Sequence, residues 1–190
     1  MKSIEKIRKS LENYDRVRER IIQGSRKVIQ NSKQAIYAMQ RDDFAVAQSS
    51  IEKMRTGLLA LKALTQAEPR LSYEGIYKVA IQEYVEALAL YEFIKKGSII
   101  PYSGEFVDPE NYLMGLCDLS GELVRKAINA SIRENYSLAV KIRAVMDELY
   151  VDLSRIDFKN GELRRKYDGI KYDLKKVDDL VFELKMKGKI

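Results

Sequence analysis

The 190-residue sequence contains no histidine. The absence of imidazole excludes Ser–His and Cys–His nucleophile pairs as well as His-ligated zinc sites. Any proton transfer would therefore depend on carboxylates, lysine, tyrosine or a metal-bound water. The sequence has a single cysteine, Cys117, so an internal disulfide cannot form. A reducing, cytoplasmic environment is the natural expectation.

Proline and glycine are scarce, with 3 and 10 residues respectively. So few helix-breaking residues favour long, uninterrupted helices over many short strands. No apolar run approaches the roughly 18 residues that a membrane-spanning helix needs. The charged N-terminal segment also lacks the apolar core of a signal peptide. We therefore expect a protein that has no membrane partner and is not secreted.

Apolar residues recur at helical spacing along most of the chain. Together with capping residues, they predict an all-α antiparallel bundle of six to seven helices in one domain, residues 1–190. The first helix should cover about 3–40, the second should follow Asp42 and Asp43 and end near Glu68, and the third should cover about 73–96. The side chains expected to cap the last three helices are Asp108, Asn135 and Asn160.

The third predicted helix carries acids where an apolar stripe is expected. Its stripe would include Ile76, Val79 and Leu90, but positions 83 and 86 on the same stripe are Glu83 and Glu86. Buried carboxylates are costly unless they are paired or bound to a cation. Residues three apart on a helix lie roughly 5–6 Å apart at Cβ, close enough to share one metal ion.

The fourth predicted helix has a second acidic pair, Asp118 and Glu122, on one face. If the third and fourth helices pack side by side, four carboxylates meet. Such oxygen ligands suit Mg²⁺ or, as an alternative, Mn²⁺, which could activate a water molecule. The alternative is structural: a nearby Arg125 or Lys78 would neutralise the acids. The missing histidine excludes the Glu-x-x-His pairs of ferritin-like di-iron proteins.

Positive charge is concentrated at the two ends of the chain. Residues 1–30 contain 9 Lys and Arg against 4 Asp and Glu, and residues 159–190 contain 10 against 6. Basic ends around an acidic centre fit an anionic polymer, and they equally fit two solvated helix faces. The candidates for contacts with nucleic-acid phosphates are Arg16, Arg18, Arg20, Arg26 and Lys27.

Four segments resemble the translin superfamily, and specifically its translin-associated factor X branch. They are YDRVRERIIQGSRKVIQNSKQAI at 14–36, IQEYVEALALYEFIKKGSII at 81–100, DPENYLMGLCDLSGELVRKAINASI at 108–132, and RIDFKNGELRRKYDGIKYDLKKVDDLVFELKMKG at 155–188. Together they cover nearly the whole chain. The short stretch 97–108 departs from the factor X branch, which has a long insertion there.

The resemblance implies an all-helical protein that binds single-stranded RNA or DNA and assembles into a homo-octamer. It also implies a Mg²⁺-dependent endoribonuclease, because the acidic positions of the factor X branch fall on Glu83, Glu86, Asp118 and Glu122. Translin itself carries an apolar residue at the position of Asp118.

Two other functions remain open on the sequence. The first is a non-catalytic protein that binds single-stranded RNA or DNA, in which the acids are structural and the basic residues functional. The second is a purely structural helical oligomer without a nucleic-acid partner. The absence of a P-loop and of a Gly-x-Gly-x-x-Gly motif argues against a nucleotide-cofactor enzyme.

Overall fold

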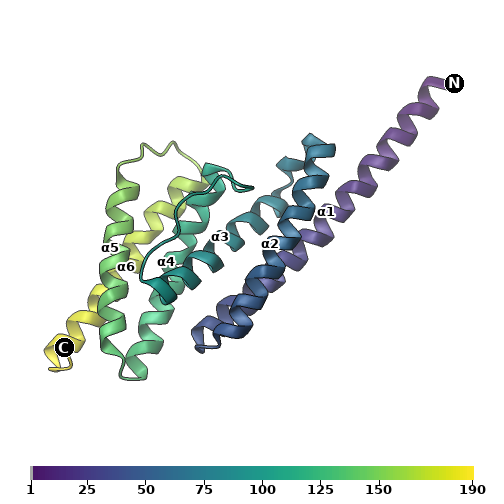
Figure 1. The fold of residues 1–190 in the computed structure, drawn as a ribbon. Coiled ribbons are helices and arrows are strands. Elements are labelled where there is room, and N and C mark those ends of the chain that lie inside the picture. Colours follow the sequence, from purple (N-terminus) through teal and green to yellow (C-terminus); the bar gives the residue numbers. More distant parts are fainter. Residues whose placement is uncertain (1) are drawn as a thin grey trace.

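The computed structural model describes residues 2–190, and all regular structure within them is helical (Figure 1). The elements are α1 (Lys2–Gln40), α2 (Phe44–Ala67), a short 3₁₀ helix η1 (Pro69–Tyr73), α3 (Gly75–Lys96), α4 (Pro109–Ile132), α5 (Tyr136–Ser154) and α6 (Glu162–Met186). The predicted all-α bundle is therefore confirmed. The sequence did not predict η1.

The helices form two groups joined through α3 (Figure 1). On one side α1 packs along α2, and on the other α4 packs against α5 and α6. Helix α3 contacts α1, α2 and α4, so it occupies the centre of the molecule. This position makes α3 the element through which the two groups share one core.

The capping residues explain where most helices begin. Asp43, Asp108 and Asn135 each accept a hydrogen bond from the backbone N–H three residues on, as N-cap side chains do. The prediction for Asn160 was wrong. The N-cap of α6 is Gly161, which has no capping side chain, so Asn160 stands one residue too far from the helix.

The predicted stripe of α3 was also out of phase. Leu90 is buried as predicted, but Val79 is 41% exposed, and the buried positions include Tyr77, Ala80 and Tyr84, which lay outside the predicted stripe. A helix that contacts three neighbours buries residues around most of its circumference, so its sequence has no single apolar face to locate. Glu83 and Glu86 lie half-buried beside the core.

The two halves of α1 differ in burial although they share one apolar spacing. In the second half, Ile21, Val28 and Met39 are fully buried against the bundle. In the first half, Ile4 and Leu11 are exposed, and this part of α1 projects beyond the other helices (Figure 1). Among the residues described, no helix is long and apolar enough to cross a membrane.

Candidate metal centre

The two acidic pairs lie on neighbouring helices that approach very closely. Glu83 and Glu86 are on α3, and Asp118 and Glu122 are on α4, which packs against α3. At Gly115, three residues before Asp118, an added Cβ would lie 2.6 Å from the backbone oxygen of Gln82 on α3. Only glycine permits this approach, and it brings the backbones that carry the acids together.

Glu86 interacts electrostatically with the other three predicted acids. The pKa of Glu86 is raised to about 8, and burial is the largest cause. The negative charges of Glu83, Asp118 and Glu122 raise the pKa of Glu86 further, whereas Lys166 opposes the shift. The structure thus places Glu83, Asp118 and Glu122, from two helices, within electrostatic range of Glu86.

Lys166 and Arg125 partly compensate this negative charge. Lys166 of α6 places its Nζ 2.5 Å from Asp118 Oδ2, and Arg125 lies 3.7 Å from Glu122 Oε2. Arg125 was expected as a partner of the acids. Lys166 was not, because it lies 48 residues beyond Asp118 and no local spacing connects the two.

Glu122 is held by a second residue that the sequence did not single out. Gln40, the last residue of α1, donates from Nε2 to Glu122 Oε2 at 2.8 Å and to the Glu122 backbone oxygen at 3.1 Å. Gln40 is only 3% exposed. The buried amide therefore links the end of α1 to the acidic side chain on α4.

The donor chemistry of this cluster fits a hard divalent cation. All four predicted ligands are carboxylates, and both burial and the three neighbouring negative charges raise the pKa of Glu86. With the side chains as they lie here, no three Asp, Glu or Cys residues of the described chain are arranged to coordinate one metal ion. A cation would therefore require side-chain rearrangement, beginning with the Asp118–Lys166 pair.

Cys117, beside Asp118, takes no part in this chemistry. It is buried, and burial raises the pKa of its thiol to about 12. The thiol therefore stays protonated near neutral pH and acts as a small apolar group.

The predicted phosphate-binding residues are exposed along α1, namely Arg16, Arg18, Arg20, Arg26 and Lys27. Arg18 is engaged elsewhere, because it forms a salt bridge with Glu74 at 2.7 Å. Arg20 and Lys27 line a hollow of about 910 Å³ between α1 and α2. These two side chains are thus the best placed of the set to contact a ligand on this surface.

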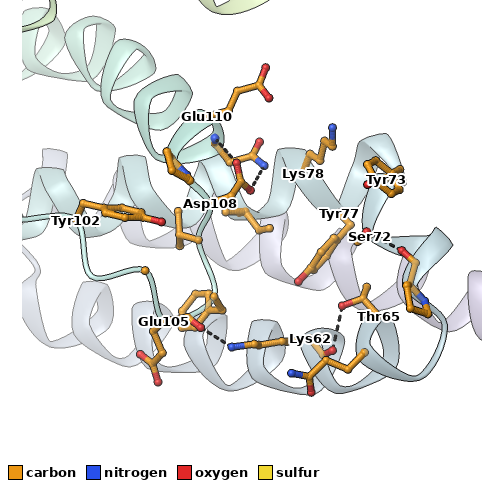
Figure 2. Close-up of a pocket in the computed structure, with 18 residues that line it drawn as sticks. Lys62, Thr65, Ser72, Tyr73, Tyr77, Lys78, Tyr102, Glu105, Asp108 and Glu110 are labelled. Carbon is orange, nitrogen blue, oxygen red and sulfur yellow. Dashed lines mark hydrogen bonds between the residues drawn. The ribbon is translucent and has the colours of Figure 1, made fainter. Parts of the chain in front are cut away.

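A second hollow, of about 730 Å³, lies between α2, η1, α3 and the loop that precedes α4 (Figure 2). Tyr73, Tyr77 and Tyr102 line it, and Figure 2 shows Lys62 reaching across to the backbone oxygen of Glu105. At 100° per residue, Tyr77 and Glu86 are about 180° apart around α3. This hollow therefore opens on the opposite side of α3 from the acids.

A family model described as Translin family matches residues 16–188, which include all four acids. The chain belongs to the translin family. Mouse (Mus musculus) translin is 27% identical over 156 residues, covering 75% of this chain and 68% of that translin. For human (Homo sapiens) translin the covered share is 65%, so the chain spans about two thirds of the length of these translins.

Two further relatives and two solved structures extend this picture of the translin family. An uncharacterized protein of Methanocaldococcus jannaschii is 32% identical over 162 residues, covering 83% of this chain and 72% of that protein. Translin-associated protein X of Rattus norvegicus is 23% identical over 211 residues, covering 90% of this chain and 73% of that protein. The structure of apo-NeC3PO has a TM-score of 0.88 at 30% identity, covering 96% of this chain and 97% of that one. AfC3PO in a complex with duplex RNA has a TM-score of 0.82 at 22% identity, covering 97% of both chains, and this likeness shows the fold alone.

Proposed function

We propose that this translin-family chain is a metal-dependent endoribonuclease that binds and cleaves single-stranded RNA as a homo-oligomer. The observation that carries the proposal is the meeting of Glu83 and Glu86 on α3 with Asp118 and Glu122 on α4. Burial first, and then the negative charges of the other three acids, raise the pKa of Glu86 to about 8. A divalent cation would neutralise these carboxylates, and carboxylate oxygens are the ligands that Mg²⁺ prefers.

The four carboxylates would hold Mg²⁺, or Mn²⁺ in its place. When bound, the ion would supply Lewis-acid activation of water and stabilisation of negative charge at the scissile phosphate. A carboxylate of the set that is not engaged as a ligand can accept the proton of the attacking water. Gln40 and Arg125 hold Glu122 in place for this task.

The basic residues of α1 would bind the RNA backbone. Arg16, Arg20, Arg26 and Lys27 are exposed, and contacts from such side chains to phosphates give affinity without sequence preference. AfC3PO, which shares this fold, has been solved with duplex RNA. That complex supports RNA as the polymer, and single-stranded RNA, with single-stranded DNA as an alternative, is our proposal for this chain.

The projecting half of α1 supports a homo-oligomer. Ile4, Ile7 and Leu11 are 69%, 52% and 56% exposed and follow the spacing of a coiled-coil seam. A contiguous apolar stripe of this kind is normally covered by a partner. We propose that copies of this chain cover it, in an octamer by resemblance to the family. Light scattering on the purified chain should give a mass well above the 21.9 kDa of the monomer.

A second candidate is a non-catalytic RNA-binding protein. One observation favours it: Asp118 already has an ion-pair partner in Lys166, and Glu122 already accepts a hydrogen bond from Gln40. In that case the acids stabilise the packing of α1, α4 and α6, and only the basic surface is functional. Binding of RNA would then weaken with salt, and no cleavage would accompany it.

One experiment separates the two candidates. The purified chain is incubated with labelled single-stranded RNA, and in parallel with duplex RNA, in the presence of Mg²⁺ or EDTA. We expect cleavage products only with Mg²⁺, and their loss in Asp118→Ala and Glu122→Ala variants that still fold and bind RNA. Undiminished cleavage by these variants would overturn the nuclease proposal, and binding without any cleavage would favour the second candidate.

A further inference from the structure

Gln40 is a buried amide at the junction of α1 and α4. It ends α1, it is 3% exposed, and its partners Glu122 and Asn129 are both on α4. Burying an amide is costly unless its polar atoms are hydrogen-bonded. The contacts of Gln40 therefore indicate what the residue does at this position.

The hydrogen bonds of Gln40 satisfy its amide and fix its orientation. Nε2 donates to Glu122 Oε2 at 2.8 Å and to the Glu122 backbone oxygen at 3.1 Å, while Oε1 accepts from Asn129 Nδ2 at 3.1 Å. If the amide were turned over, its Oε1 would face two oxygens of Glu122, acceptor against acceptor. Asn129 thus keeps the donor side of Gln40 directed at the Glu122 carboxylate.

We infer that Gln40, held in orientation by Asn129, is a positioning residue that directs the Glu122 carboxylate toward the bound cation. The inference rests on the proposed function, because it assigns Glu122 to a metal centre. Gln40 itself is not a ligand in this assignment. It occupies one carboxylate oxygen, Oε2, and so leaves the other, Oε1, as the oxygen that meets the ion. Hydrogen bonds of this kind to ligating carboxylates tune metal affinity and activity.

The chain offers a matched control in a second buried amide pair. Gln82 on α3 donates to Asn111 Oδ1 on α4 at 2.7 Å, and both residues are buried. None of the hydrogen bonds of this pair reaches the four acids, because Asn111 in turn donates to Asp108 at the start of α4. Gln40→Met and Gln82→Met therefore each remove one buried interhelical amide, at similar structural cost.

The test measures Mn²⁺ binding to the full chain by isothermal titration calorimetry, with Mn²⁺ as the probe. We expect Gln40→Met to weaken Mn²⁺ binding about tenfold, within the range typical of residues that support metal ligands. Gln82→Met should stay within about twofold of the unaltered chain, because the amide it removes does not contact the acids. In RNA cleavage, Gln40→Met should lower kcat and leave KM for RNA unchanged.

Asn129→Ala provides a second variant that leaves Gln40 in place. It should weaken Mn²⁺ binding less than Gln40→Met, and the double variant should be no worse than Gln40→Met alone, because Asn129 acts only through Gln40. Equal Mn²⁺ affinities for Gln40→Met and Gln82→Met, or additive effects of Gln40→Met and Asn129→Ala, would overturn the inference alone. Failure of the unaltered chain to bind Mn²⁺ would overturn the proposed metal centre itself.

Discussion

Helix α3 separates two polar regions whose acids are used in different ways. On the side of the tyrosine-lined hollow (Figure 2), Asp108 caps α4. Glu105 pairs with Arg55 at 3.3 Å, so each of these two carboxylates has a partner. On the other side, Lys166 pairs with Asp118 and opposes the raised pKa of Glu86, while Arg125 lies 3.7 Å from Glu122. Negative charge is thus balanced beside the hollow and in excess in the acidic cluster. An excess of negative charge, not the size of a hollow, therefore marks the candidate centre.

The largest expected difference between the two sides concerns cleavage. Glu83→Gln removes a proposed ligand, so we expect RNA cleavage to slow by about a hundredfold or more, beyond what supporting residues usually contribute. Glu110→Gln removes an exposed carboxylate that lines the hollow and should leave the rate unchanged. Single-turnover rates at saturating Mg²⁺ provide the measurement. Equal rates for the two variants would remove the distinction between the two sides of α3.

The next largest effect concerns the stability of the metal-free chain as pH changes. The pKa of Glu86 is about 8 in the folded chain and about 4.5 when unfolded, so the folded state binds its proton more tightly. Stability from this group is therefore complete below about pH 4.5 and is lost as pH rises through about 8. Glu86→Gln should abolish this loss and stabilise the chain at pH 8.5 by about 2 kcal/mol, after a discount for partial exposure.

The measurement is thermal unfolding in EDTA across pH 5 to 8.5, compared with Glu110→Gln. A gain of about 2 kcal/mol corresponds to roughly 4–8 °C in Tm for a chain of this size. For Glu86→Gln the gain should be small at pH 5, grow steadily as pH rises and level off above about pH 8, whereas Glu110→Gln should show no gain at any pH. A pH-independent difference between Glu86→Gln and the unaltered chain would show that burial and the neighbouring acids do not raise the pKa of Glu86 in the folded chain.

A smaller effect is expected at Lys166, which supplies positive charge to the acidic side. Lys166→Met removes a cation that pairs with Asp118 at 2.5 Å, so Mg²⁺ should bind about fivefold more tightly, as expected for the loss of about 1 kcal/mol of competing attraction. Lys176→Met is the matched control, since Lys176 pairs with Asp173 at 2.8 Å, outside the four acids. The measurement is the Tm of each variant as a function of Mg²⁺ concentration, from which the affinity for Mg²⁺ is obtained. Weaker Mg²⁺ binding by Lys166→Met than by the unaltered chain would contradict the prediction.

The sequence predicted the parts of this structure that depend on local chemistry. The caps Asp43, Asp108 and Asn135 were predicted because an N-cap side chain bonds to a backbone group only three residues away. The close contact at Gly115, by contrast, depends on a backbone atom of α3 and leaves no local pattern. The existence of the helices therefore followed from the residues, whereas the tight approach of α3 to α4 did not.

The candidate site divides in the same way. Glu83 and Glu86 share a helix face by spacing alone, as do Asp118 and Glu122, and the family resemblance joined the two pairs. Lys166 and Gln40 reach the cluster from 48 and 82 residues away, so no helical periodicity could indicate them. The predicted position of the apolar stripe on α3 was wrong for a related reason, because three neighbouring helices decide which of its residues are buried.

The smallest expected effect concerns the path of RNA to the acidic side. If RNA lies along α1, Arg20→Gln should reduce the dependence of log K on log salt by about 0.7, the value for one phosphate contact to a single strand. Lys78→Gln, which removes one positive charge beside the tyrosine-lined hollow, should leave that slope unchanged. Fluorescence anisotropy with labelled single-stranded RNA at several salt concentrations measures both slopes. An equal reduction for Lys78→Gln would extend the RNA surface to the far side of α3, and the acids would then no longer be the feature that sets the two sides apart.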